Sequence, residues 1–151
     1  IILTPHPGEM ARLSGQSTVD IQKDRISHAR SFAQQYRVTV VLKGAATVVA
    51  LPDGTAYLNT SGNPGMAAGG MGDVLTGIIA GLISQGIAPS TAAIAGVYLH
   101  GLAADRMSID KGPVGYLATE VMDAIPEVIN AMLTVSDDCT STILDSLCYS
   151  L

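Results

Sequence analysis

The residues with the clearest potential for chemistry lie in a glycine-dense segment, Gly65–Asp73, that directly precedes an apolar helical pattern. Glycines let successive backbone N–H groups converge, and a helix N-terminus adds the positive end of its dipole, so such a segment can bind an anion. It has neither the Lys-Ser/Thr ending of a Walker A loop nor the glycine spacing of a Rossmann fingerprint. The segment therefore predicts an anion site that belongs to neither of these two motifs.

Asp73 is the unusual member of this segment, because a carboxylate opposes the binding of phosphate. One explanation is that Asp73 caps the following helix, since Asp is a preferred N-cap residue. The other is that Asp73 is a general base, which takes the proton from a substrate hydroxyl beside a transferring phosphoryl group. The residues alone leave both explanations open.

A second candidate is the segment Thr4–Glu9, Thr-Pro-His-Pro-Gly-Glu, which follows a short apolar strand pattern at Ile1–Leu3. Two prolines hold His6 rigidly at the carboxyl end of that strand, which is where α/β proteins bind their ligands. The alternative is a stiff strand-to-helix turn that carries an exposed histidine.

A third candidate is Lys43-Gly44, at the end of the β-branched run Val38–Leu42. Lys43 could meet a phosphate there, and Gly44 would let the backbone approach a ring or a sugar. The alternative is a lysine that closes a buried strand, with its aliphatic stem covered and its ammonium in water.

Other residues with chemical potential are expected to be structural. His100 lies in an alanine-rich helical pattern and is expected to pack rather than to bind a ligand. The two cysteines, Cys139 and Cys148, form no metal-binding spacing. The sequence thus predicts no metal site built from protein side chains.

The elements that must position these residues are predicted from hydrophobic periodicity, turn residues and caps. Strands come early and helices late, which predicts a three-layer α/β/α fold with a Rossmann-like sheet. Asp53-Gly54 predicts a hairpin turn. Thr119 is expected to cap the last helix, and Pro126 either to kink it or to start a new one. Besides Ile1–Leu3 and Val38–Leu42, strands are predicted at Thr47–Leu51 and Ala56–Leu58, and the remaining helices at Pro7–Gly15, Ser17–Tyr36, Val74–Gln85 and Ser90–Arg106.

Composition excludes several classes of function. With 8 basic and 13 acidic residues, the net charge of −5 argues against binding to nucleic acid or to anionic membranes. The stretch Val74–Ala104 contains no charged residue, but polar residues and a proline divide it into segments too short to span a bilayer. No signal-peptide pattern is present, so a cytoplasmic location is expected.

Three motifs together identify a family. Thr4–Glu9, Val41–Ala45 and Asn63–Gly77 occur in the order and at the distances found in ADP/ATP-dependent NAD(P)H-hydrate dehydratases. These form the kinase-like C-terminal module of bifunctional nicotinamide-nucleotide repair proteins. The resemblance covers residues 1–133 and implies a ribokinase-like fold. It also implies an enzyme, a lyase, that removes the water wrongly added to the nicotinamide ring of NADH or NADPH.

The resemblance implies a role for each motif. His6 and Asp73 would contact the hydrated nucleotide, and Asp73 would activate its ring hydroxyl for phosphorylation. The phosphate would then leave with help from the dihydropyridine nitrogen. ADP or ATP is the implied phosphoryl donor, and Mg²⁺ is expected with it because phosphoryl transfer usually needs charge neutralisation. An anion hole at Gly70, Met71 and Gly72 would neutralise the phosphoryl group, and the adenosine phosphate would be held by Gly72 and by Lys43, Gly44, Ala45, Ala46 and Thr47.

The chain also departs from the family pattern. Members are much longer, so we expect residues 1–133 to be the C-terminal part of the domain, truncated at its N-terminus and prone to form a homo-oligomer through exposed sheet edge and apolar surface. Residues 134–151 are expected to be a disordered or non-native tail, and Ala46 stands where many relatives have Gly. Two alternatives stay open: a ribokinase-like kinase for a vitamin precursor, and a nucleotide-binding or assembling fragment without catalysis. Thr4–Glu9 favours the dehydratase over the kinase.

Overall fold

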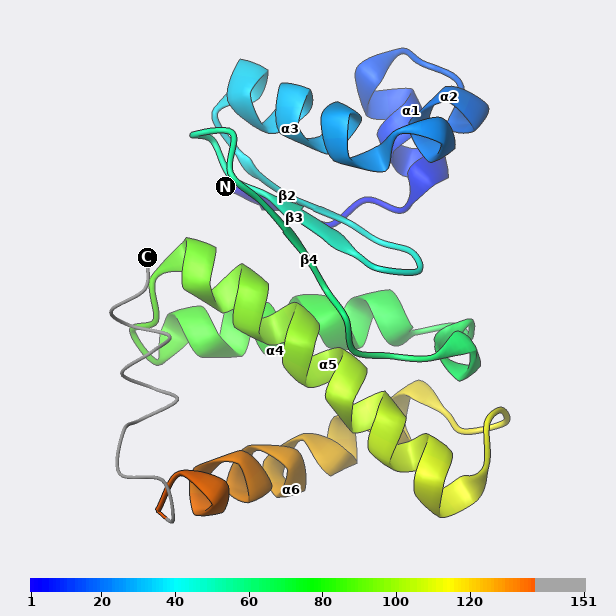
Figure 1. Ribbon diagram of the computed structural model, residues 1–151, viewed down its shortest axis with the longest axis vertical. Coiled ribbons are helices and arrows are strands. Elements are labelled where there is room, and N and C mark those ends of the chain that lie inside the picture. Colours follow the sequence, from blue (N-terminus) through cyan, green and yellow to red (C-terminus); the bar gives the residue numbers. More distant parts are fainter. Residues whose placement is uncertain (138–151) are drawn as a thin grey trace.

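The computed structural model describes residues 1–137, in which helices lie on both faces of one sheet (Figure 1). The strands are β1 (Ile2–Leu3), β2 (Thr39–Leu42), β3 (Val48–Ala50) and β4 (Ala56–Leu58), in that spatial order. β1 pairs with β2 in parallel, and β2, β3 and β4 pair antiparallel. The predicted three-layer α/β architecture and the predicted hairpin are confirmed.

This topology places three strand ends at one edge of the sheet. β1, β2 and β4 run in the same direction, so the segments that follow Leu3, Leu42 and Leu58 all leave from that edge. A hydrogen bond of 2.9 Å from the Asn59 N–H to the Thr47 carbonyl joins two of these connections. Residues after the strands are thereby brought together although they are far apart in the sequence.

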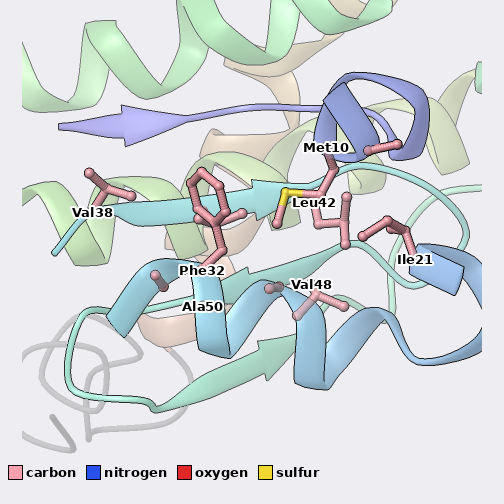
Figure 2. Close-up of a cluster of buried hydrophobic side chains, with 11 residues drawn as sticks. Met10, Ile21, Phe32, Val38, Leu42, Val48 and Ala50 are labelled. Atoms are coloured by element: carbon pink, nitrogen blue, oxygen red, sulfur yellow. The ribbon is translucent and has the colours of Figure 1, made fainter. Parts of the chain in front are cut away.

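One face of the sheet is covered by α1 (Pro7–Ser14), α2 (Thr18–Lys23) and α3 (Arg25–Tyr36) (Figure 1). Alternate residues of a strand point to opposite faces, so one set of β2 and β3 side chains meets these helices. Figure 2 shows this core, which includes Met10, Ile21, Phe32, Val38, Leu42, Val48 and Ala50.

The expected single helix over Ser17–Tyr36 is wrong, because Asp24 divides it into α2 and α3. Ser17 caps α2 by accepting a 3.1 Å hydrogen bond from the Asp20 N–H. Asp24 leaves the helical conformation and accepts a 3.0 Å hydrogen bond from the Ser27 N–H, so it caps α3. A short acidic side chain competes with the helical backbone in this way, and the resulting bend leaves Ile21 fully buried.

The other face is covered by α4 (Met71–Ser84) and α5 (Pro89–Lys111). Val41 and Val49 of the sheet pack there with Leu75, Ile79 and Val97. α6 (Ala118–Asp137) packs on α5 and α4 around a separate apolar cluster, on the side away from the sheet (Figure 1). Within residues 1–137, no helix combines the length and apolarity needed to cross a bilayer.

Several helix boundaries differ from those predicted. α4 begins at Met71 rather than Val74, and α5 continues past Arg106 to Lys111. α6 begins at Ala118 and continues through Pro126, so Thr119 is not its cap. Instead, the Leu117 N–H donates a 2.7 Å hydrogen bond to Glu120. The first residues of the expected tail, 134–137, belong to α6, and 138–151 lie outside the described residues.

Candidate active site

A cavity of about 420 Å³ lies beside the sheet edge at which the three strands end. The predicted nucleotide-binding residues Lys43–Thr47 and Gly72 all line it. The segment after β4, which includes the short 3₁₀ helix η1 (Pro64–Met66), forms another part of the wall. The remaining lining residues come from α4 and α5: Met71, Leu75, Val97, His100 and Gly101.

The loop Lys43–Thr47 is held by several hydrogen bonds. The Lys43 N–H donates to the Pro5 carbonyl at 2.8 Å, and the Thr47 hydroxyl donates to the Gly44 carbonyl at 3.0 Å. From the opposite side, the Arg25 guanidinium donates to the carbonyls of Leu42, at 2.9 Å, and Ala45. The loop therefore has a defined backbone shape without a ligand.

The first turn of α4 supplies the predicted anion-binding groups. Gly70 is the N-cap residue, with φ 87°, and α4 starts at Met71. The first N–H groups of a helix have no partner within the helix, so those of Met71 and Gly72 are available to an anion. A Cβ built at Gly72 would lie 3.0 Å from the Lys43 Nζ, so the Lys43 ammonium lies directly beside this helix end. The N-terminus of α4 and the Lys43 ammonium, both sources of positive potential, therefore lie side by side.

The interpretation of Asp73 as a helix cap is wrong, because Gly70 holds the N-cap position and Asp73 is the third residue of α4. The Asp73 side chain is exposed and adjoins Gly72, which lines the cavity. In the part of the chain that the structure describes, no hydrogen bond or ion pair engages the Asp73 carboxylate. Its position is compatible with the alternative role, that of a general base.

His6 is the N-cap residue of α1. Its Nδ1 accepts hydrogen bonds from the N–H groups of Gly8, at 3.1 Å, and Glu9, at 3.2 Å. An Nδ1 that accepts is unprotonated, so the neutral ring carries its proton on Nε2, which lies 3.3 Å from Glu9 Oε1. The His6 side chain is about half exposed, at 51%. The motif is therefore a rigid strand-to-helix turn that also presents an oriented imidazole to solvent.

Glu9 connects His6 to Lys43. Its Oε2 accepts a 2.7 Å hydrogen bond from the His6 backbone N–H and lies 3.6 Å from the Lys43 Nζ. The His6 N–H, assisted by the charge of Lys43, lowers the pKa of Glu9 below its usual value. The Lys43 ammonium is consequently held by a carboxylate beside the anion site, where a phosphate could compete for it.

The three predicted motifs form one continuous surface. A 3.3 Å hydrogen bond joins the hydroxyls of Thr4 and Thr76, so the end of β1 is linked to α4. A second depression, of about 400 Å³, borders the same surface, with Thr4, Pro5 and Glu9 in its lining. The structure therefore brings the Thr4–Glu9 motif, Lys43 and the start of α4 together at the carboxyl ends of β1 and β2.

Asp105 of α5 supports the cavity wall through its hydrogen bonds, although it was not among the residues predicted from the sequence. Its Oδ2 accepts a 2.8 Å hydrogen bond from the Gly62 N–H, and its Oδ1 accepts one of 3.0 Å from the Asn63 side chain. Asn63 Oδ1 in turn accepts hydrogen bonds from the Gly65 N–H and the Tyr116 hydroxyl. Asp105 is the first charged residue after the charge-free stretch of the sequence, and this position was the signal that could have revealed it.

His100 is buried in the cavity wall, as its alanine-rich surroundings predicted. Burial lowers its pKa from 6.5 to about 4, so the imidazole is neutral near pH 7. Among residues 1–137, no side chain or backbone group forms a hydrogen bond with its Nε2.

Residues 1–137 contain no group of three or more His, Cys, Asp or Glu side chains that could hold a metal ion. The two cysteines lie outside the described residues.

The sequence matches the NAD(P)H-hydrate dehydratase family over residues 1–127. It is 50% identical over 129 residues to the bifunctional NAD(P)H-hydrate repair enzyme of Moorella thermoacetica, covering 85% of this chain and 24% of that protein. It is 42% identical over 128 residues to the ADP-dependent (S)-NAD(P)H-hydrate dehydratase of Bacillus subtilis, covering 85% of this chain and 46% of that protein.

Solved structures of a dehydratase and of a ribokinase-like protein are also similar to this chain. The ADP/ATP-dependent NAD(P)H-hydrate dehydratase of Bacillus subtilis, co-crystallised with ATP/Mg²⁺ and soaked with CoA, has a TM-score of 0.84 and 42% identity, over 86% of this chain and 48% of that one. A ribokinase-like superfamily protein of Enterococcus faecalis has a TM-score of 0.73 at 35% identity, over 86% and 44%.

The chain spans about half the length of the single-function relatives and about a quarter of the bifunctional ones. Within that span the ribokinase-like fold is confirmed, and the motifs that carried the resemblance all lie inside the matched residues. The chain belongs to the NAD(P)H-hydrate dehydratase family.

Proposed function

We propose that this chain binds ADP or ATP and hydrated NADH or NADPH, and that it takes part in the nucleotide-dependent dehydration that restores NAD(P)H. The observation that carries this proposal is the position of Lys43, whose ammonium lies between Glu9 of the Thr4–Glu9 motif and Gly72 of α4. One side chain thus joins the segments that resemble the substrate motif and the phosphoryl motif.

The nucleotide fits the cavity beside the loop Lys43–Thr47. Its phosphates would lie against the Lys43 ammonium and the free N–H groups at the start of α4, which attract negative charge. When bound, the nucleotide supplies the phosphoryl group that turns a poor leaving group, hydroxide, into a phosphate. Mg²⁺ would be held by those phosphates, because residues 1–137 contain no cluster of three or more His, Cys, Asp or Glu side chains that could hold it. The co-crystallisation of the Bacillus subtilis relative with ATP/Mg²⁺ supports the binding of these two ligands.

Asp73 is the proposed general base. Its exposed carboxylate follows Gly72, so it would face a substrate placed against the phosphoryl end of the nucleotide. Asp73 would take the proton of the ring hydroxyl, and the hydroxyl oxygen would bond to the terminal phosphorus while the P–O bond to the rest of the nucleotide breaks. The ring C–O bond would then break as phosphate leaves, and loss of a ring proton would restore NADH or NADPH. His6, oriented by its contacts with Gly8 and Glu9, would contact the hydrated nucleotide with its half-exposed imidazole.

The involvement of the Thr4–Glu9 motif in this site supports the dehydratase over a vitamin-precursor kinase, because the kinase would not require it. The proposal includes a cytoplasmic location, where NADH and NADPH are made and used. It also includes a homo-oligomer, which is supported by exposed apolar side chains at the end of α5 and before α6, among them Ile109, Val114 and Leu117.

The decisive experiment is the recovery of NADH absorbance from hydrated NADH, with ADP or ATP and Mg²⁺ added. It uses this chain, its Asp73→Asn variant, and Asp123→Asn as a control on the exposed surface of α6. Loss of a general base should lower the rate at least about 100-fold. ADP affinity, measured by calorimetry, should stay within about threefold in Asp73→Asn.

Two outcomes would contradict parts of this proposal. An Asp73→Asn variant as active as the wild-type chain would remove Asp73 from catalysis. A folded wild-type chain that binds ADP without restoring NADH would support the non-catalytic nucleotide-binding alternative instead.

A further inference from the structure

Arg25, the first residue of α3, reaches from the helix layer to the loop that borders the cavity. Its Nη2 donates a 2.9 Å hydrogen bond to the carbonyl of Leu42, the last residue of β2. Its Nη1 donates to the carbonyl of Ala45. One planar guanidinium thus links the two carbonyls on either side of Lys43-Gly44.

The guanidinium also fills the space beside the loop backbone. A Cβ built at Gly44 would lie 3.0 Å from Arg25 Nη2 and 3.1 Å from Cζ, so the backbone lies directly on the charged group. Gly44 has φ 142° and Ala46 has φ 50°, a conformation that an L-residue rarely adopts. The loop therefore needs an external contact to keep this shape, and Arg25 supplies it.

The charge of Arg25 is unusual. Within residues 1–137 no carboxylate forms an ion pair with it, and its buried Nε has no hydrogen-bond partner. The residue as a whole is only partly buried, but partial burial of a cation without a counter-ion is still unfavourable. A positive charge beneath the loop does favour the approach of an anion from the cavity side, together with Lys43 and the N-terminus of α4.

We propose that Arg25 is a positioning residue for the nucleotide. It holds the loop Lys43–Thr47 in the shape that presents its backbone and the Lys43 ammonium to the phosphates. Both the geometry and the charge of the guanidinium contribute to nucleotide binding. The planar fork reaches two carbonyls at once, and the positive charge attracts the phosphates. This inference rests on the proposed binding of an adenine nucleotide at the loop.

The test compares Arg25→Lys and Arg25→Met with Arg30→Lys and Arg30→Met. Arg30 is a matched control, because it lies on the same helix and its Nε donates a 2.7 Å hydrogen bond to a turn carbonyl, that of Gly54. Amide hydrogen exchange over residues 43–47 is measured without ligand. Affinities for ADP and for hydrated NADPH are measured by calorimetry, and melting temperatures report the fold.

We expect Arg25→Lys to speed exchange in residues 43–47 and to weaken ADP binding at least about tenfold. Affinity for hydrated NADPH should change less than about twofold, a difference that general destabilisation would not produce. Arg25→Met should weaken ADP binding further, since the charge is lost as well. The Arg30 variants should show the same amide exchange in residues 43–47 and the same ADP affinity as the wild-type chain.

If amide exchange in residues 43–47 of Arg25→Lys equals that of the wild-type chain, the positioning role is overturned, regardless of the affinity of this variant for ADP. ADP affinity within about twofold of wild type in Arg25→Met would overturn it as well. A wild-type chain that binds no ADP would overturn the proposed function itself, and the exchange measurement distinguishes that failure from the other two.

Discussion

Arg37 ends α3 in the left-handed conformation, with φ 53°. For a residue with a Cβ this conformation costs about 1–2 kcal/mol, whereas glycine adopts it freely at helix C-termini. The Arg37 side chain is exposed. Its replacement by glycine therefore relieves strain without removing a buried contact.

We expect Arg37→Gly to raise the free energy of unfolding by up to about 1 kcal/mol, after the entropic cost of glycine in the unfolded chain is subtracted. Urea denaturation measures the change. Arg37→Ala is the control, since it removes the charge but keeps the strained conformation. An equal gain in Arg37→Ala would show that charge, not backbone strain, is responsible.

His100 makes the stability of the fold depend on pH. Its pKa is lowered to about 4 by burial, from 6.5. Between these two pH values the unfolded chain binds a proton that the folded chain does not. The free energy of unfolding must then fall as the pH falls, by about 1.4 kcal/mol per unit and about 3 kcal/mol over the whole interval.

The prediction is tested by urea denaturation of the wild-type chain and of His100→Gln across this pH range. The acidic side chains with lowered pKa values, such as Glu9, are common to both proteins, so their contributions cancel. The stability difference between the two should change by about 3 kcal/mol. If the free energies of unfolding of the two proteins changed in parallel with pH, burial would not lower the pKa of His100 in the folded chain.

At the scale of the elements, a polar network fixes the segment between β4 and α4 against α5. Asp105 accepts hydrogen bonds from both Gly62 and Asn63. Asp105→Ala leaves these donors without their partner and should lower the free energy of unfolding by about 2 kcal/mol. Asp110→Ala, which removes only a surface ion pair with Arg106 on the same helix, should cost less than about 1 kcal/mol. Urea denaturation of both variants checks the comparison.

Asp105→Ala should also weaken ADP binding, because Gly62 and Asn63 line the cavity. Calorimetric titration with ADP measures this effect. An Asp105→Ala variant that is destabilised but binds ADP normally would show that the network supports the fold alone.

The strands and most helices could be predicted because their signals are local. The β-branched run before Lys43, the Asp53-Gly54 turn and the Pro7 helix start are each contained in a few residues. Errors arose where several local signals competed. Asp24 can lie inside a helix or cap one, and its non-helical backbone and hydrogen bond from the Ser27 N–H make it the cap of α3.

The site was predictable in its segments but not in its contacts. His6, Lys43 and the glycine-rich segment are recognisable from their residue types. The two roles of Asp73 could not be separated from the sequence, because the start of α4 depends on the left-handed conformation of Gly70. Arg25 and Asp105 were not predictable either, because they act through long-range hydrogen bonds to backbone groups and side-chain amides that no short motif encodes.

At the scale of the whole molecule, the proposed oligomer depends on apolar surface at one end of α5. Ile109 and Val114 are 77% and 69% exposed. In sedimentation velocity experiments, an Ile109→Lys/Val114→Lys double variant should weaken self-association at least about tenfold. Val19→Lys, at a residue of α2 that is 65% exposed, is the matched control. A wild-type chain that stays monomeric at high concentration would contradict the proposal.

The cavity-lining loop Lys43–Thr47 is also the turn of a β-hairpin, with Leu42 and Val48 paired at its base. Its two ends are therefore fixed by the ladder, and its interior can be exchanged for the turn of another family member without changing any crossover in the fold. Nucleotide preference becomes a property that a short graft could transfer. Because the guanidinium of α3 holds this turn from outside, the graft keeps its shape only where position 25 remains arginine.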